Sequence, residues 1–181
     1  QSFDHIQRFG GHYKPIRAGG GTLQGWEFSG TLPLNVVSDV LDGFGLIASY
    51  TIIDQDVKDQ NGNVYKLPGL SKKIQSYTAF YENSGFQARV SLRKRGDFSG
   101  DVYGIGFDTQ QVDILGEDIV DAQIGFDFGE AGYKQLDGLS IFLQGQNLTE
   151  EPFVSLQGSP FKIRDYQDYG STYLLGFSYK L

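Results

Sequence analysis

The last residues of the chain carry its clearest pattern, an alternation of apolar and polar positions. From residue 173 to residue 181, every second side chain is aromatic or aliphatic, and those between are mostly small or polar. The apolar set is Tyr173, Leu175, Phe177, Tyr179 and Leu181. Successive side chains of a strand point to opposite faces, so this stretch predicts a β-strand with one apolar, aromatic face.

Six earlier stretches predict strands in the same way. They cover about 22–34, 44–57, a stretch that follows Lys72 and ends at Glu82, 86–95, 119–128 and 139–148. The fourth is the clearest of them, because Phe86, Ala88, Val90 and Leu92 alternate with polar side chains. The outward face is expected to carry the apolar set in each strand, with the polar set on the inner face.

The connectors between these strands alternate in length. The long ones, 58–71, 96–117 and 150–168, read as loops, and so does the aperiodic segment 1–19. The short ones are 35–43, 83–85 and 129–138, of which Asn83-Ser84-Gly85 is a tight hairpin turn. Long loops at one rim and short turns at the other are typical of outer-membrane β-barrels.

The apolar faces are expected to contact lipid. Aromatic residues stand at both ends of the apolar face of the last strand, as in the girdles of membrane barrels. No apolar run approaches the ~18 residues of a membrane-spanning helix, so any spanning would be by strands. The mean hydropathy of -0.30 does not exclude this, because a barrel strand is only half apolar. A closed antiparallel barrel needs an even number of strands, so the seven predicted here imply further strands before Gln1.

Composition excludes several classes of function. The formal net charge of -7 argues against nucleic-acid binding, which needs basic patches. The chain has no Cys, and no catalytic triad or phosphate loop is present, so no enzyme activity and no cofactor are predicted. Acidic residues between Asp54 and Asn63 resemble a calcium loop, but the sixth position is Asp59 where Gly is required, so no metal site is predicted.

An ordered set of short motifs resembles the TonB-dependent outer-membrane receptors. The motifs are Gly25-Trp-Glu27-Phe28, Asp42-Gly-Phe-Gly45 with Ala48-Ser-Tyr50-Thr51, Leu67-Pro-Gly-Leu-Ser-Lys72, Phe80-Tyr-Glu-Asn-Ser-Gly-Phe-Gln-Ala-Arg-Val90 and Gln146-Asn-Leu-Thr149 with Glu151-Pro152. The end of the chain adds Tyr169-Gly and Tyr173-x-x-Gly176, and Gly176, Tyr179 and Leu181 resemble the C-terminal signal that the barrel-assembly machinery reads. The resemblance runs from about Gly20 to Leu181. It is strongest to the branch typified by Xanthomonas and Caulobacter receptors.

The resemblance implies a fold and a function. Residues 1–181 would be the last seven or so strands of a 22-stranded transmembrane barrel in the outer membrane of a Gram-negative bacterium, with the plug and earlier strands outside this chain. The whole receptor would take up a scarce nutrient, an oligosaccharide by its branch or else a metal–siderophore complex. Its partners would be outer-membrane lipid, its own plug and remaining strands, TonB with ExbB and ExbD, and the assembly machinery.

Two sets of candidate residues follow. Aromatic side chains of the long loops are ligand-binding candidates, because aromatic faces stack on sugar rings and catechols; they also suit an aromatic girdle or packing within the loops. They are Tyr103, Phe107, Phe153, Phe161 and Tyr166. Glu27, Arg89, Arg93 and Arg95 fall on the inner face and would meet the plug or a ligand, or form an ordinary solvated wall.

A second class of protein fits the same strand pattern. A soluble lipocalin-like barrel has about this length and closes eight strands around one ligand. Solubility separates the two hypotheses, because a lipocalin-like chain would stay folded and monomeric without detergent.

Overall fold

The computed structural model describes residues 2–9, 12–58, 61–103 and 109–180, with side chains from residue 20 onward except that of residue 109. Its regular elements are twelve β-strands and three short 3-10 turns, η1 (Leu34–Val36), η2 (Asp39–Leu41) and η3 (Lys134–Leu136). No helix among these residues is long and apolar enough to cross a membrane.

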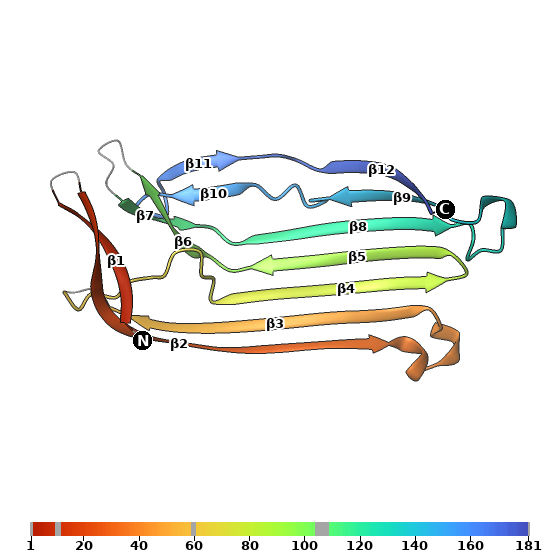
Figure 1. Cartoon of the computed structure of the whole chain (residues 1–181), viewed down its shortest axis with the longest axis horizontal. Helices are drawn as coiled ribbons and strands as arrows, with labels where there is room; N and C mark the ends of the chain where they lie inside the picture. The colour runs from red at the N-terminus through yellow and green to blue at the C-terminus, as the bar shows by residue number, and fades with distance from the viewer. Residues whose placement is uncertain (1, 10–11, 59–60, 104–108, 181) are drawn as a thin grey trace.

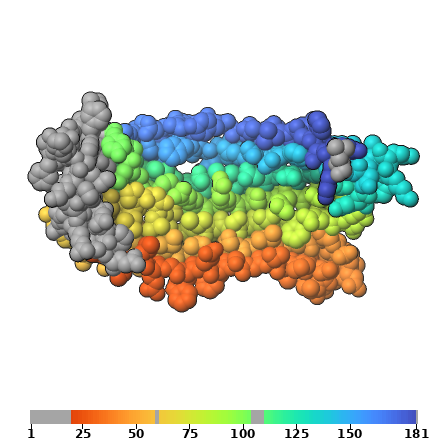
Figure 2. Space-filling view, viewed as in Figure 1, coloured from red at the N-terminus to blue at the C-terminus, as the bar shows by residue number. Residues whose placement is uncertain are grey.

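Eight strands form the main sheet, in the order β1-β2-β3-β4-β5-β8-β9-β12. They are β1 (Ser2–Phe9), β2 (His12–Pro33), β3 (Phe44–Val57), β4 (Lys73–Asn83), β5 (Phe86–Arg95), β8 (Glu117–Asp127), β9 (Leu139–Gln146) and β12 (Thr172–Tyr179). Every neighbouring pair is antiparallel. The long strands lie side by side in Figure 1, and Figure 2 shows them as bands that follow the order of the sequence.

The seven predicted strands correspond to β2, β3, β4, β5, β8, β9 and β12. The predicted all-β antiparallel fold is therefore confirmed. Alternation identified these strands because each is long and keeps one apolar face.

The loop prediction was wrong in three places. Residues 1–19 contain β1 and the first part of β2. The connectors 96–117 and 150–168 contain β6 (Phe98–Tyr103), β7 (Thr109–Ile114), β10 (Phe153–Leu156) and β11 (Ile163–Gln167), which form a second sheet in the order β11-β10-β7-β6. Strands of four to six residues show too few alternations to be recognised, and the pairing of β7 with β10 joins segments distant in the sequence.

The main sheet is open. Its two edge strands are β1 and β12, and no pairing joins them among the described residues. A closed eight-stranded barrel of lipocalin type is therefore not formed by these strands.

The register brings the apolar positions of all the long strands to one face. Directly paired residues share a face of an antiparallel sheet. The pairs Trp26–Ile52, Leu46–Ala79, Tyr77–Leu92, Phe86–Phe126, Ile124–Leu143 and Leu143–Leu175 lie on this face. Leu175 and Phe177 expose 82% and 81% of their surface, so nothing within the described chain covers this part of the face.

Aromatic rings gather where the apolar face meets the short turns. The rings of Phe44 and Tyr81 are 4.4 Å apart, and Phe86 continues the row. Phe126, Phe128 and Tyr133 form a second group, with 5.1 Å between the two phenylalanine rings. The apolar face therefore has an aromatic border at the short turns.

Two glycines on the opposite face make room for phenylalanine rings. Gly45 pairs directly with Phe80, and Gly176 pairs directly with Phe142. A Cβ at either glycine would overlap the ring of its partner. An aromatic side chain that covers a strand glycine compensates for the packing that glycine lacks, so these pairs stabilise the register.

The buried side chains lie at the end of the molecule that carries the long connectors. Among the described side chains, Val57, Val112 and Leu156 are the buried hydrophobic ones, and Ser71, Ser99 and Ser155 are the buried polar ones. The wall formed by the long strands therefore has little core of its own. The connectors 35–43, 83–85 and 129–138 lie at the opposite end, together with the end of β12 (Figure 1).

Substitution of Gly176 by Ala tests the contact with Phe142. Overpacking against the ring should cost about 1–3 kcal/mol of unfolding free energy. The measurement is the midpoint of urea unfolding of the whole protein in detergent micelles.

Gly30→Ala is the matched control. Gly30 is also a strand glycine, and a Cβ there meets nothing within 4 Å. It should be neutral or stabilising, because alanine loses less backbone entropy than glycine on folding. Equal losses at the two positions would show that the Phe142 ring is not the cause.

Candidate functional site

Residues 66–72 cross the end of the main sheet as a strap. The backbone N–H of Leu67 donates to Gln55 Oε1 at 3.0 Å, and that of Gly69 donates to the Ser99 carbonyl at 2.7 Å. The strap is therefore attached to β3 on one side and to β6 on the other. The turn signal Pro68-Gly69 permits this path, because Gly69 has a φ of 78°.

Arg95 fastens the strap from β5. Its Nε donates to Ser71 Oγ at 2.8 Å, and its Nη2 donates to the Gly69 carbonyl at 2.6 Å. Its guanidinium lies over the Phe98 ring, 3.7 Å from the centroid. A planar guanidinium can donate in its plane while it stacks on an aromatic face, so Arg95 holds three segments together.

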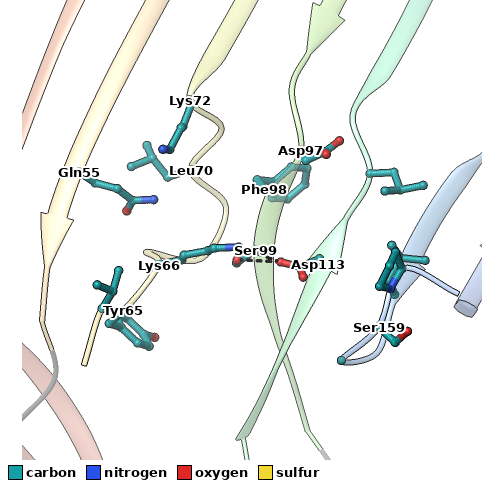
Figure 3. A pocket seen from close by; sticks show the side chains of 15 residues that line it. Gln55, Tyr65, Lys66, Leu70, Lys72, Asp97, Phe98, Ser99, Asp113 and Ser159 are labelled. Carbon is teal, nitrogen blue, oxygen red and sulfur yellow. Dashed lines mark hydrogen bonds and ion pairs between the residues drawn. The ribbon is translucent and has the colours of Figure 1, made fainter. Parts of the chain in front are cut away.

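A pocket of about 490 Å³ lies between the strap, β6, β7 and the turn from β10 to β11. Leu70, Leu115 and Leu156 provide apolar walls, and Ser159 lies at the turn (Figure 3). The strap, β6, β7 and β10 each contribute side chains, so the pocket depends on the second sheet that the sequence did not predict.

Charges of both signs line this pocket in equal number. They belong to Lys66, Lys72, Asp97 and Asp113. Lys66 Nζ lies 3.3 Å from Asp113 Oδ1, and both side chains are more than half exposed, so this ion pair contributes little to stability. Ser99 Oγ donates to the same oxygen at 3.4 Å. Asp97 Oδ1 accepts from the Gly116 N–H at 2.6 Å.

Tyr65 lies in the wall beside the strap. Its hydroxyl donates to Asp101 Oδ2 at 3.4 Å. Partial burial raises the pKa of Tyr65, and the negative charge of Asp101 and the hydrogen bond to it raise that pKa further. The phenol therefore stays protonated and remains a hydrogen-bond donor at neutral pH.

Asn147 joins the two ends of the connector that carries β10 and β11. Its Nδ2 donates to the carbonyls of Glu151 and Gly170, each at 3.2 Å, and its Oδ1 accepts from the Glu151 N–H at 3.0 Å. Its own N–H donates to Asp121 Oδ1 at 2.9 Å. Its φ of 51° lies in the left-handed region, which asparagine tolerates better than most residues. One side chain thus ties the start of this connector to its return at β12.

The predicted aromatic candidates are not brought together. Phe161 is 95% exposed, Tyr103 and Tyr166 are also exposed, and no ring contact joins these three or Phe153 among the described residues. None of the four lines the pocket. Phe107 lies outside the described residues. Their role in ligand binding stays a prediction.

The inner-face candidates differ from one another. Glu27 and Arg93 are exposed and form no hydrogen bond or ion pair with the part of the chain that the structure describes. Arg89 lies 3.7 Å from Glu82, and both side chains are more than half exposed. Arg95 is the exception, because the strap occupies its hydrogen-bonding groups.

The residues of the predicted assembly signal lie on two faces. Gly176 packs under Phe142 on the inner face, and Tyr179 pairs with Leu139 on the apolar face. Leu181 lies outside the described residues. The signal function of these residues stays a prediction.

Sequence reasoning missed the residues of the pocket and the role of Asn147. Leu70 and Lys72 of the pocket lie in the motif Leu67-Pro-Gly-Leu-Ser-Lys72, and Asn147 lies in Gln146-Asn-Leu-Thr149. The rest of the pocket lining lies outside the motifs. The partly buried Asn147 bonds to partners far away in the chain, Asp121 and Gly170, so the motif alone does not reveal its role.

Comparisons with known proteins were made by sequence and by structure. No family model matches the chain, and no curated protein matches it. Among solved structures, the ferric citrate transporter FecA in its unliganded form has a similar structure, with a TM-score of 0.68 and 16% sequence identity. The similarity covers 90% of this chain and 24% of FecA. The chain shares the fold of part of FecA. It spans about a quarter of the length of that transporter.

Substitution of Asn147 by Asp tests whether the side-chain amide of Asn147 holds the connector. Aspartate tolerates the same backbone conformation but cannot donate to the carbonyls of Glu151 and Gly170, so the connector should loosen by about 1–3 kcal/mol. Faster hydrogen exchange of the amides of residues 148–151 would report this.

Asn83→Asp is the control. Among the described residues, the Asn83 side chain accepts a hydrogen bond from Ser84 Oγ and donates none. Aspartate can accept the same bond. Unchanged exchange in Asn147→Asp would mean that the amide donors do not hold the connector.

Proposed function

We propose that this chain forms part of the barrel wall of a TonB-dependent outer-membrane receptor. The observation that carries the proposal is the continuous apolar face of seven long antiparallel strands, with an aromatic rim at the short turns. The fold shared with part of FecA and the family motifs of the sequence support it. Lipid would cover the apolar face, and backbone groups at the open edges would pair with further strands.

The receptor would transport a scarce nutrient with energy delivered by TonB, ExbB and ExbD through the plug. The motifs resemble the branch typified by Xanthomonas and Caulobacter receptors, which favours an oligosaccharide. A metal–siderophore complex is the alternative, and the ferric citrate of FecA is a ligand of the related metal-chelate kind. The exposed Glu27, Arg89 and Arg93 would face the plug, and the exposed aromatic residues of the long connectors would meet the ligand first.

Arginine substitutions on the two faces of β12 test the lipid-facing assignment. Leu175 lies near the middle of β12 on the apolar face, and Ser178 lies on the inner face opposite Ser140. Leu175→Arg should cost about 2–4 kcal/mol in lipid vesicles, because it places a charge in hydrocarbon, whereas Ser178→Arg should cost little. Unfolding free energies of the whole protein in vesicles provide the measurement, and equal costs would refute the assignment.

Thiol labelling tests which rim lies outside the cell. Ser84 lies in a short turn, and Ser159 lies in a long connector at the other end of the molecule. The chain has no native Cys, so Ser84→Cys and Ser159→Cys introduce single thiols in it. A membrane-impermeant reagent applied to intact cells should label the second variant and not the first, and disrupted cells should allow labelling of both. The reverse pattern in intact cells would invert the proposed topology.

A further inference from the structure

The pocket beside the strap is lined by other residues than the loop aromatics that the sequence suggested as ligand contacts. We propose that it binds an uncharged, polyhydroxylated ligand, of the size of one or two sugar rings. This inference rests on the proposed receptor function and adds the location and chemistry of a binding site to it. The volume of about 490 Å³ falls within the ~300–1,000 Å³ of ordinary ligand pockets.

The balance of charges favours a neutral ligand. Lys66 and Lys72 on one side are matched by Asp97 and Asp113 on the other. An anionic chelate would bring its charge close to two carboxylates, whose repulsion would offset the attraction of the two ammonium groups. A polycation would be repelled by the two ammonium groups, which would offset its attraction to the carboxylates. A neutral ligand needs no excess of either sign.

The polar groups retain unused hydrogen-bonding capacity. Asp97 and Asp113 each accept through Oδ1, which leaves Oδ2 without a hydrogen bond among the described residues. The Lys72 ammonium forms no hydrogen bond or ion pair in the same part of the chain. A hydroxyl group donates and accepts, so one hydroxyl can bridge a carboxylate and an ammonium. Several hydroxyls on one ring would use these groups together.

The apolar walls suit the remaining surface of such a ligand. Leu70, Leu115 and Leu156 line the pocket between the charged groups. A sugar ring is amphipathic, because its C–H groups form apolar patches between the hydroxyls. Contact of those patches with the leucines would remove apolar area from water on both sides.

The pocket is held in shape without a ligand. Arg95 fixes the strap that carries Leu70 and Lys72, and Asn147 fixes the ends of the connector that carries Leu156 and Ser159. A preformed site needs less ordering when it binds, so more of the interaction energy appears as affinity.

The test uses the whole protein purified in detergent and an array of immobilised neutral and acidic oligosaccharides, with ferric citrate as a soluble anionic probe. Binding should be confined to neutral members of the array, and ferric citrate should not compete. Asp97→Asn and Asp113→Asn should each lower the affinity for the bound sugar about tenfold or more, because each removes a charged acceptor. Near-ultraviolet circular dichroism confirms that the variants fold.

Glu150→Gln is the control, because Glu150 lies in the connector at the same end, is exposed and lies outside the pocket lining. It should leave the affinity unchanged. The inference is overturned if no neutral sugar binds, if only acidic sugars or ferric citrate bind, or if both Asp variants bind as the parent does. The proposed receptor function fails separately, through the labelling and vesicle experiments above, which do not depend on the pocket.

Discussion

Register between neighbouring strands determines which face of the sheet each apolar side chain occupies. Side chains alternate with a period of two, so a slip of one residue in any pair would move a whole apolar set to the other face. Six antiparallel pairings keep the apolar sets of seven strands aligned, from β2 at one side to β12 at the other. The Phe80–Gly45 and Phe142–Gly176 contacts oppose such slips, because a shifted register would place a Cβ under each ring.

The two ends of the molecule are stabilised differently. At the short turns, aromatic rings pack against one another on the face of the sheet. At the long connectors, the second sheet and the strap enclose small buried residues such as Ser71 and Val112. Hydrogen bonds of Arg95 and Asn147 hold this end together. The wall between these ends has its apolar side chains on the surface, so its stability depends on what surrounds it. The end with the long connectors has internal contacts of its own, so its shape depends less on those surroundings.

The sequence was sufficient to predict the long strands and insufficient to predict the structure of the long connectors. β5 and β12 were recognisable because alternation over many residues is a local signal. β6, β7, β10 and β11 were not, because each has only four to six residues, and the pairing of β7 with β10 joins segments far apart in the chain. Arg95 stood in the alternating pattern of β5, but its attachment to Ser71 depends on the path of the strap. Asn147 stood in a recognisable motif, while its partners Asp121 and Gly170 could be identified only in three dimensions.

The contact between Phe142 and Gly176 has a consequence for how this protein can change in evolution. Side chains at positions 142 and 176, on adjacent strands, compete for the same space, so the side chain permitted at either position depends on the other. A larger residue at 176 would require a smaller one at 142, and related proteins should exchange bulk between these positions in a correlated way. The glycine near the C-terminus would then be retained for the neighbour that covers it as well as for any machinery that recognises the end of the chain.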